Sequence, residues 1–157
     1  SNVSLSQKTF SHDALVFKHG DAEALSFENC TFDIVINVES SHCYPNVNKF
    51  ISEVRRVLRP KGYFLYTDFR SAADMLKLKE MLEDSQMILL RYKDITQNVA
   101  EAIRLDNERR AAILKSMANT DKRYRALAEF TRLVGTRGYE SFCNRSDTYM
   151  SFVLQKS

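Results

Sequence analysis

A group of polar side chains follows an aliphatic run in the segment FDIVINVESSHCYP, residues 32–45. The run predicts a buried strand, and Asn37, Glu39 and His42 come directly after it. An imidazole can accept a proton near neutral pH, because its ordinary pKa is about 6.5. A carboxylate nearby can orient the ring or bind a substrate. The segment therefore predicts a site for proton transfer, and we expect no metal there, since His42 and Cys43 alone do not supply a tetrahedral ligand set.

The elements around this segment alternate between strands and helices. Strands are predicted at residues 14–22, 32–39, 63–69 and 86–95, and helices at 47–58 and 71–84. The helix at 47–58 has apolar residues at steps of three and four, Pro60 ends it, and residues 59–62 are predicted to form a turn. This order indicates an α/β fold with a largely parallel sheet.

Polar residues also follow two other predicted strands. Asp21 ends the first strand, and Thr67, Asp68 and Arg70 end the one at 63–69. Ligands of such folds bind beyond the carboxyl ends of the strands. We therefore expect three polar groups, including the one at Asn37 to His42, to meet at one rim of the sheet.

The composition limits the classes of function. The 157 residues, 44% of them hydrophobic, suit one domain. The 23 basic and 20 acidic residues do not indicate a nucleic-acid binder, and no apolar run reaches the roughly 18 residues of a membrane span. Three cysteines predict no disulfide framework, and we expect a cytoplasmic protein.

The segment from Leu15 to Arg70 resembles the middle of a class I S-adenosylmethionine-dependent methyltransferase. The resemblance rests on GDAEALSF, on the strand that enters NVE and on EVRRVLRPKGYF, in the family's order and spacing. NVESSHCYP, with DITQNV and YMSFVLQK later in the chain, resembles the branch of phthiotriolone and phenolphthiotriolone dimycocerosate O-methyltransferases and related natural-product enzymes.

The resemblance implies a role for each matching residue, with S-adenosylmethionine as the cofactor. Asp21 and Ala22 would meet the adenine, Asn37 and Val38 the methionine part, and Glu39 and His42 the methyl acceptor, with His42 as base. Plainer readings stay open at this point. Asp21 can cap a turn, Asn37 can satisfy loop backbone, Glu39 can pair with an arginine, and His42 can be an inert histidine before the helix.

The chain departs from the family at its N-terminal end. The family places a glycine-rich loop after strand 1, and only four glycines occur here, none in such a pattern. In the family's strand order, 3-2-1-4-5-7-6, the residues before Leu15 are too few for strands 1 and 2. We therefore expect a Rossmann-like sheet missing strands 1 and 2, in a partial domain that self-associates or pairs with a missing N-terminal segment.

A helical insertion is expected before the last strand. Helices are predicted at about 96–117 and 121–134, followed by a closing strand in DTYMSFVLQKS. This divides the single partial domain, 1–157, into an α/β core of 1–95 and 139–157 and an insertion of 96–138, which the resemblance implies is a lid over the acceptor. The basic residues of the insertion can contact RNA or an anionic surface, but interspersed acids favour a solvated face.

Two functions follow from the sequence. The first is methyl transfer from S-adenosylmethionine to a hydroxyl of a small, bulky, apolar molecule. The alternative is a non-catalytic, methyltransferase-like chain that pairs with another chain.

Overall fold

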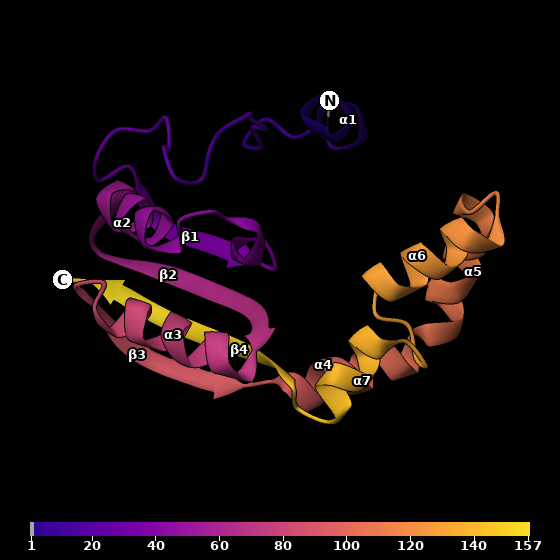
Figure 1. Cartoon of the computed structure of the whole chain (residues 1–157). Coiled ribbons are helices and arrows are strands. Elements are labelled where there is room, and N and C mark those ends of the chain that lie inside the picture. Colours follow the sequence, from indigo (N-terminus) through magenta and orange to yellow (C-terminus); the bar gives the residue numbers. More distant parts are fainter. Residues whose placement is uncertain (1) are drawn as a thin grey trace.

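A mixed four-stranded sheet organises the computed structural model, which describes residues 2–157 (Figure 1). The strands are β1 (Phe32–Val38), β2 (Leu58–Ser71), β3 (Met87–Asp94) and β4 (Asp147–Lys156), in the spatial order β1-β2-β4-β3. This order equals the 4-5-7-6 end of the strand order expected from the sequence, and the α/β, Rossmann-like fold class is confirmed.

The expectation of a largely parallel sheet is wrong for the described chain. Only β1 and β2 are parallel, while β4 is antiparallel to both of its neighbours. The helices between β3 and β4 return the chain to the end of the sheet where β3 stops. Asp94, the last residue of β3, lies opposite Met150 near the start of β4. From that end β4 can only run back across the sheet.

Two helices cover one face of the sheet, α2 (Val47–Val57) and α3 (Ala72–Glu83) (Figure 1). Both begin as the sequence predicts, because Asn46 and Ser71 accept hydrogen bonds from the backbone N–H groups of Lys49 and Asp74. Their apolar stripes bury one core against the strands, formed by Phe50, Ile51, Val54, Leu58, Phe64, Tyr66, Met75, Leu78, Leu82, Met87, Phe152 and Leu154.

The predicted turn at residues 59–62 is an irregularity inside β2. The pairing between β1 and β2 shifts between Phe32 and Ile34, so that Ile34 lies opposite Tyr63. A Cβ at Gly62 would lie 2.9 Å from the carbonyl oxygens of Arg59 and Asp33. Glycine is therefore required where the two backbones approach most closely.

The other face of β1 is uncovered, which corrects the expectation of a strand buried on both faces. Ile34, Ile36 and Val38 are 52%, 66% and 57% exposed. Both packed helices lie on the opposite face, and no helix among residues 2–157 packs on this one. An aliphatic strand that reads as fully buried thus exposes half of its side chains in the described chain.

The strand predicted at residues 14–22 is also not formed. After α1 (Asn2–Thr9), this segment has only an isolated bridge between Asp21 and Ala24, and Leu15 and Val16 are exposed. A strand requires a hydrogen-bonded neighbour along its length. In the family's strand order that neighbour is strand 2, which none of residues 2–157 provides.

Four helices lie between β3 and β4: α4 (Thr96–Leu105), α5 (Asn107–Met117), α6 (Asp121–Phe130) and α7 (Arg137–Cys143). The helix predicted at 96–117 is broken at Asp106, and the one predicted at 121–134 ends at Phe130. The second boundary of the predicted insertion, residue 138, falls inside α7, and the division into core and insertion stays a prediction. Across residues 2–157 we find no helix with the length and apolar character needed to cross a bilayer.

Candidate active site

The loop after β1 turns sharply toward the sheet rim. Glu39 follows the strand with φ of 48°, a left-handed conformation that is uncommon for glutamate. Its backbone N–H donates to the Thr67 carbonyl of β2, 3.0 Å away, which extends the strand pairing by one residue. A short helix, η1 (Ser41–Cys43), then leads toward α2. This turn places Glu39 and His42 at the rim of the sheet.

His42 is paired with a buried aspartate from the next strand. Its Nδ1 lies 2.9 Å from Asp68 Oδ1, and its backbone N–H donates to Asp68 Oδ2 at 3.1 Å. The His42 side chain is 29% exposed, whereas Asp68 is fully buried. In a neutral imidazole, a proton on Nδ1 that is donated to Asp68 leaves Nε2 as a free acceptor. The arrangement is that of a histidine held ready to take a proton.

Asp68 is kept ionised by a network of donors beneath the rim. Burial alone would raise the pKa of Asp68, but hydrogen bonds from Ser41 and His42 and the charge of Arg70 outweigh it and hold the pKa below its usual range. Ser41 Oγ donates to Asp68 Oδ2 at 2.7 Å, and Arg70 Nη1 lies 3.1 Å from the same oxygen. The carboxylate is therefore charged throughout the neutral range.

The same network reaches the centre of the sheet. Ser41 Oγ also accepts from Arg70 Nη2 at 2.8 Å and contacts the Tyr66 hydroxyl. Burial raises the pKa of Tyr66 to about 12, so its hydroxyl remains a donor at neutral pH. One donated and two accepted bonds satisfy the Ser41 hydroxyl, which explains a fully buried serine in this position.

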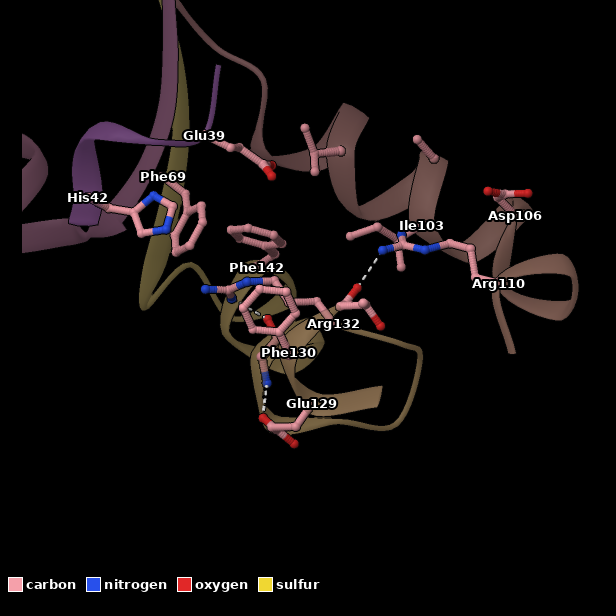
Figure 2. Close-up of a pocket in the computed structure, with 14 residues that line it drawn as sticks. Glu39, His42, Phe69, Ile103, Asp106, Arg110, Glu129, Phe130, Arg132 and Phe142 are labelled. Atoms are coloured by element: carbon pink, nitrogen blue, oxygen red, sulfur yellow. Dashed lines mark hydrogen bonds between the residues drawn. The ribbon is translucent and has the colours of Figure 1, made fainter. Parts of the chain in front are cut away.

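A cavity of about 760 Å³ lies between this rim and the helices after β3. Figure 2 shows Glu39 and His42 at one end of it, with Phe69 beside them, and Ile103, Asp106 and Arg110 at the other. Its apolar lining comes mainly from Phe69, Val99, Ile103, Phe130 and Phe142. Such a lining suits an apolar ligand whose polar group is placed against Glu39 and His42.

Tyr149 of β4 stands beside Glu39. Burial raises the pKa of Tyr149, and the neighbouring Glu39 carboxylate raises it further. The tyrosine therefore stays protonated at neutral pH, with its hydroxyl directed to the neighbourhood of the Glu39 carboxylate. The sequence interpretation in which Glu39 pairs with an arginine finds no support, because no ion pair of Glu39 occurs among residues 2–157.

Arg132 joins the helical part of the cavity wall to the strands. Its guanidinium carbon lies 4.2 Å from the ring centre of Phe69 and 4.3 Å from that of Phe142. Its Nη2 donates to Asp147 at 3.0 Å, so its charge is already paired. Arg132 is thus part of the wall and not a free cation in the cavity.

Two of the four residues predicted to bind the cofactor, Asn37 and Val38, lie at the end of β1. Asn37 is buried, and its Nδ2 donates to Ser40 Oγ at 2.8 Å, but its Oδ1 has no partner among the described residues. The Val38 side chain is exposed. The buried, unpartnered oxygen of Asn37 fits a polar ligand that reaches the end of β1.

Asp21 and Ala22 lie in a turn that comes well before α2 in the sequence but contacts its first turn in the fold. Asp21 Oδ1 accepts from the Glu23 N–H, which is the turn-capping role that the sequence left open. Glu23 Oε1 accepts from the backbone N–H of Asn46, and Ala22 packs on the main core. These two contacts hold the turn next to the rim. The exposed Asp21 carboxylate uses Oδ1 within the turn, so that Oδ2 can accept a hydrogen bond from a ligand. These residues fit one side of a cofactor site.

Sequence reasoning placed Asp68 at the rim but did not identify it as the partner of His42. The two residues are 26 positions apart, and only the parallel pairing of β1 with β2 brings them together. Tyr149 was missed entirely. It lies in a strand whose sequence carries no sign of a site.

Comparisons with known proteins agree with the fold. A family described as "Methyltransferase domain" matches residues 1–66. The chain is 41% identical over 103 residues to phthiotriol/phenolphthiotriol dimycocerosates methyltransferase 1 of Mycobacterium ulcerans, which covers 66% of this chain and 38% of that protein. It is 45% identical over 89 residues to the fatty-acid O-methyltransferase of Mycolicibacterium smegmatis, covering 57% of this chain and 32% of that one.

Solved structures give the same fold at lower identity. A protein described as a putative sarcosine dimethylglycine methyltransferase from Galdieria sulphuraria superposes with a TM-score of 0.71 at 16% identity, over 99% of this chain and 64% of that chain. Phosphoethanolamine N-methyltransferase 2 of Haemonchus contortus, in a complex that contains S-adenosylhomocysteine, superposes with a TM-score of 0.70 at 16% identity, over 87% and 36%.

These matches and the strand order agree on one class: the chain is similar in sequence and fold to the class I S-adenosylmethionine-dependent methyltransferases. Its sequence relatives include the phthiotriol and phenolphthiotriol dimycocerosates methyltransferases, as NVESSHCYP predicted. The cofactor of the family is S-adenosylmethionine, which confirms the predicted cofactor class. The chain spans about two fifths or less of the length of these relatives, 38% and 40% in two cases.

Proposed function

We propose that this chain forms the acceptor-binding part of an O-methyltransferase that methylates a hydroxyl group on a bulky apolar molecule. The observation that carries the proposal is the His42–Asp68 pair at one end of an apolar cavity. A bound S-adenosylmethionine supplies a methyl group that is already activated. The residues of this chain then have two tasks, to hold the acceptor and to take its proton.

His42 performs the proton transfer in this proposal. Asp68 holds the Nδ1 proton, so the lone pair on Nε2 accepts the proton of the acceptor hydroxyl as its oxygen becomes the nucleophile. The resulting imidazolium is stabilised by the buried carboxylate of Asp68. General base catalysis of this kind typically contributes about 10²–10⁴ in rate. Placing the acceptor in a reactive orientation contributes the rest.

The cavity lining supports an apolar acceptor. Phe69, Phe130 and Phe142 give it aromatic walls, and its volume of about 760 Å³ is within the range of small-molecule sites. Two matched relatives are named for phthiotriol dimycocerosates and fatty acids, both long apolar molecules. For cofactor binding we assign Asp21 and Ala22 to the adenine side and Asn37 and Val38 to the methionine side.

The test is methyl transfer from S-adenosylmethionine to a long-chain diol, followed by mass spectrometry. It is run with this chain alone and with the N-terminal part of the Mycobacterium ulcerans relative added. We expect His42→Ala to lower kcat by about 10²–10⁴. His12→Ala is the matched control, because His12 is an exposed histidine outside the residues assigned to the acceptor and the cofactor. An unchanged kcat in His42→Ala would remove the histidine from the mechanism.

The alternative function is pairing with another chain, and the exposed face of β1 favours it. Ile34, Ile36 and Val38 are uncovered, and β1 is an edge strand. We assign this surface to a methyltransferase segment that adds a parallel strand and a covering helix. The greater length of the matched relatives supports this partner. Self-association is the other outcome of the test.

We also propose a cytoplasmic location. Cys30, Cys43 and Cys143 are all free and exposed, which suits a reducing compartment.

A further inference from the structure

The reacting end of the cavity presents only hydrogen-bond acceptors to a ligand. His42 uses its Nδ1 proton on Asp68, which leaves Nε2 as an acceptor. Glu39 offers a carboxylate to the cavity, and the neighbouring Tyr149 hydroxyl leaves acceptor capacity on its two oxygens. A ligand that reaches both groups must therefore bring a proton to donate.

The charge at this end is negative and uncompensated. Asp68 is balanced by Arg70, whose Nη1 is 3.1 Å from Oδ2. Arg132, the cation in the nearby wall, is balanced by Asp147 at 3.0 Å. No cation pairs with Glu39 in the described part of the chain.

The charged groups at the other end do not change this balance. Asp106 forms an ion pair with Arg109, and Arg110 donates to the Thr131 carbonyl across the cavity from Glu39 (Figure 2). Glu129 accepts backbone N–H groups from residues 137 and 138. None of these side chains offers a free cation next to Glu39 and His42.

The position of Glu39 is fixed by the fold. Its backbone adopts φ of 48°, and its N–H is bonded to the Thr67 carbonyl. Its carboxylate lies near the Tyr149 hydroxyl of β4, the strand adjacent to β2. A glutamate bonded through its backbone to β2 in a left-handed conformation, facing a cavity, is a built feature of the site.

We propose that Glu39 is a specificity-determining residue that excludes anionic acceptors and selects a neutral hydroxyl. This inference rests on the proposed function and deepens it. It separates two acceptor classes that both occur among the names of the matched relatives, since a fatty acid is a carboxylate at neutral pH and a phthiotriol bears hydroxyl groups. A carboxylate placed against Glu39 is repelled and has no proton for Nε2 of His42.

The experiment compares binding of dodecanol and dodecanoate to the chain at about pH 7. Both ligands carry the same alkyl chain, so the apolar cavity contributes equally to each. Affinity is measured by isothermal titration calorimetry below the concentration at which either ligand aggregates. We expect dodecanol to bind about tenfold more tightly.

Glu39→Gln removes the charge and keeps the shape of the side chain. We expect dodecanoate affinity to rise by about tenfold in this variant, with dodecanol changed by about twofold or less. Asp106→Asn is the matched control, because Asp106 also lines the cavity but is already paired with Arg109, and it should keep the preference for dodecanol. Circular dichroism checks that each variant retains its fold.

Equal affinity of the chain for the two ligands, or the same preference before and after Glu39→Gln, would overturn the inference. So would the absence of binding by either ligand. These outcomes do not depend on methyl transfer, so the proposed function can fail in the mass-spectrometric assay while the binding preference stands. The reverse result, methylation with no preference, would reject only the role of Glu39.

Discussion

Replacing Asp68 by asparagine tests the buried network directly in this chain. Asp68 is fully buried and accepts from Ser41 Oγ, the His42 backbone and His42 Nδ1, at 2.7, 3.1 and 2.9 Å. An asparagine keeps one oxygen acceptor and turns the other into an N–H donor. At least one of these donors then faces another donor, and Arg70 loses its ion-pair partner while its side chain stays only 13% exposed.

The expected loss of stability follows from these contacts. Hydrogen bonds to a charged group contribute about 1.5–3 kcal/mol each. Removing one partner of a buried ion pair costs about 3–5 kcal/mol, mostly because the other charge stays buried. The two figures describe overlapping contacts and do not add, so we expect Asp68→Asn to lower the free energy of unfolding by about 3–5 kcal/mol.

The assay is urea unfolding followed by far-ultraviolet circular dichroism. Asp33→Asn is the matched control, since Asp33 pairs with Arg59 at 2.7 Å but both side chains are largely exposed, and it should change stability by about 0.5 kcal/mol or less. If Asp68→Asn unfolds at the urea concentration of the unaltered chain with the same slope, the buried network does not exist as described.

The network also predicts how stability depends on pH. The pKa of Asp68 is lowered in the folded chain, so its contribution is fully present above the ordinary aspartate pKa of about 3.9. That contribution is lost as the pH falls through the lower, folded value. Asp68→Asn should therefore flatten part of the acid limb of the stability curve. An acid limb of unchanged steepness would contradict the assignment.

Three other predictions concern the cofactor, the exposed sheet face and a buried tyrosine. By titration calorimetry, the chain alone should bind S-adenosylmethionine weakly or not at all, because among residues 2–157 we assign only Asp21, Ala22, Asn37 and Val38 to it; tight stoichiometric binding would contradict this assignment. Ile36→Lys should reduce association in light scattering, whereas Leu76→Lys, an equally exposed change on α3, should not; the same decrease in both variants would refute the role of the β1 face. Tyr66 has a pKa raised to about 12 by burial, so its stabilising effect is present below about pH 10 and is lost as the pH rises toward 12. In an absorbance titration, Tyr66→Phe should remove one late-titrating tyrosine of the seven, and an unchanged late phase would count against this burial.

Elements with strong local signals were predicted well. The apolar stripe of α2, the Ser71 cap of α3 and the aliphatic runs of β1 and β3 all form near their expected limits. Each depends on residues close in sequence, such as the Ser71 hydroxyl and the Asp74 N–H. The break at Asp106 was missed because nothing local, neither glycine nor proline, marks it.

Burial and sheet pairing could not be read from the same patterns. Residues 14–22 have the composition of a strand but no neighbouring strand to pair with in the described chain. Ile34, Ile36 and Val38 have the composition of a buried strand, yet nothing described covers their face. A hydrophobic pattern indicates that a segment favours a buried strand. The strand forms, and its side chains become buried, only where another segment pairs with it and covers it.

The sequence by itself determined the class of fold, the resemblance to methyltransferases and the position of the polar segment from Asn37 to His42 beyond a strand. Those properties depend on local pattern and spacing. Tertiary structure alone decided that Asp68 holds the His42 ring, that Tyr149 lies beside Glu39, and that His42 and Glu39 face one apolar cavity. The reason is that these contacts join β1, β2 and β4, whose neighbourhood arises from hydrogen bonding between strands distant in sequence.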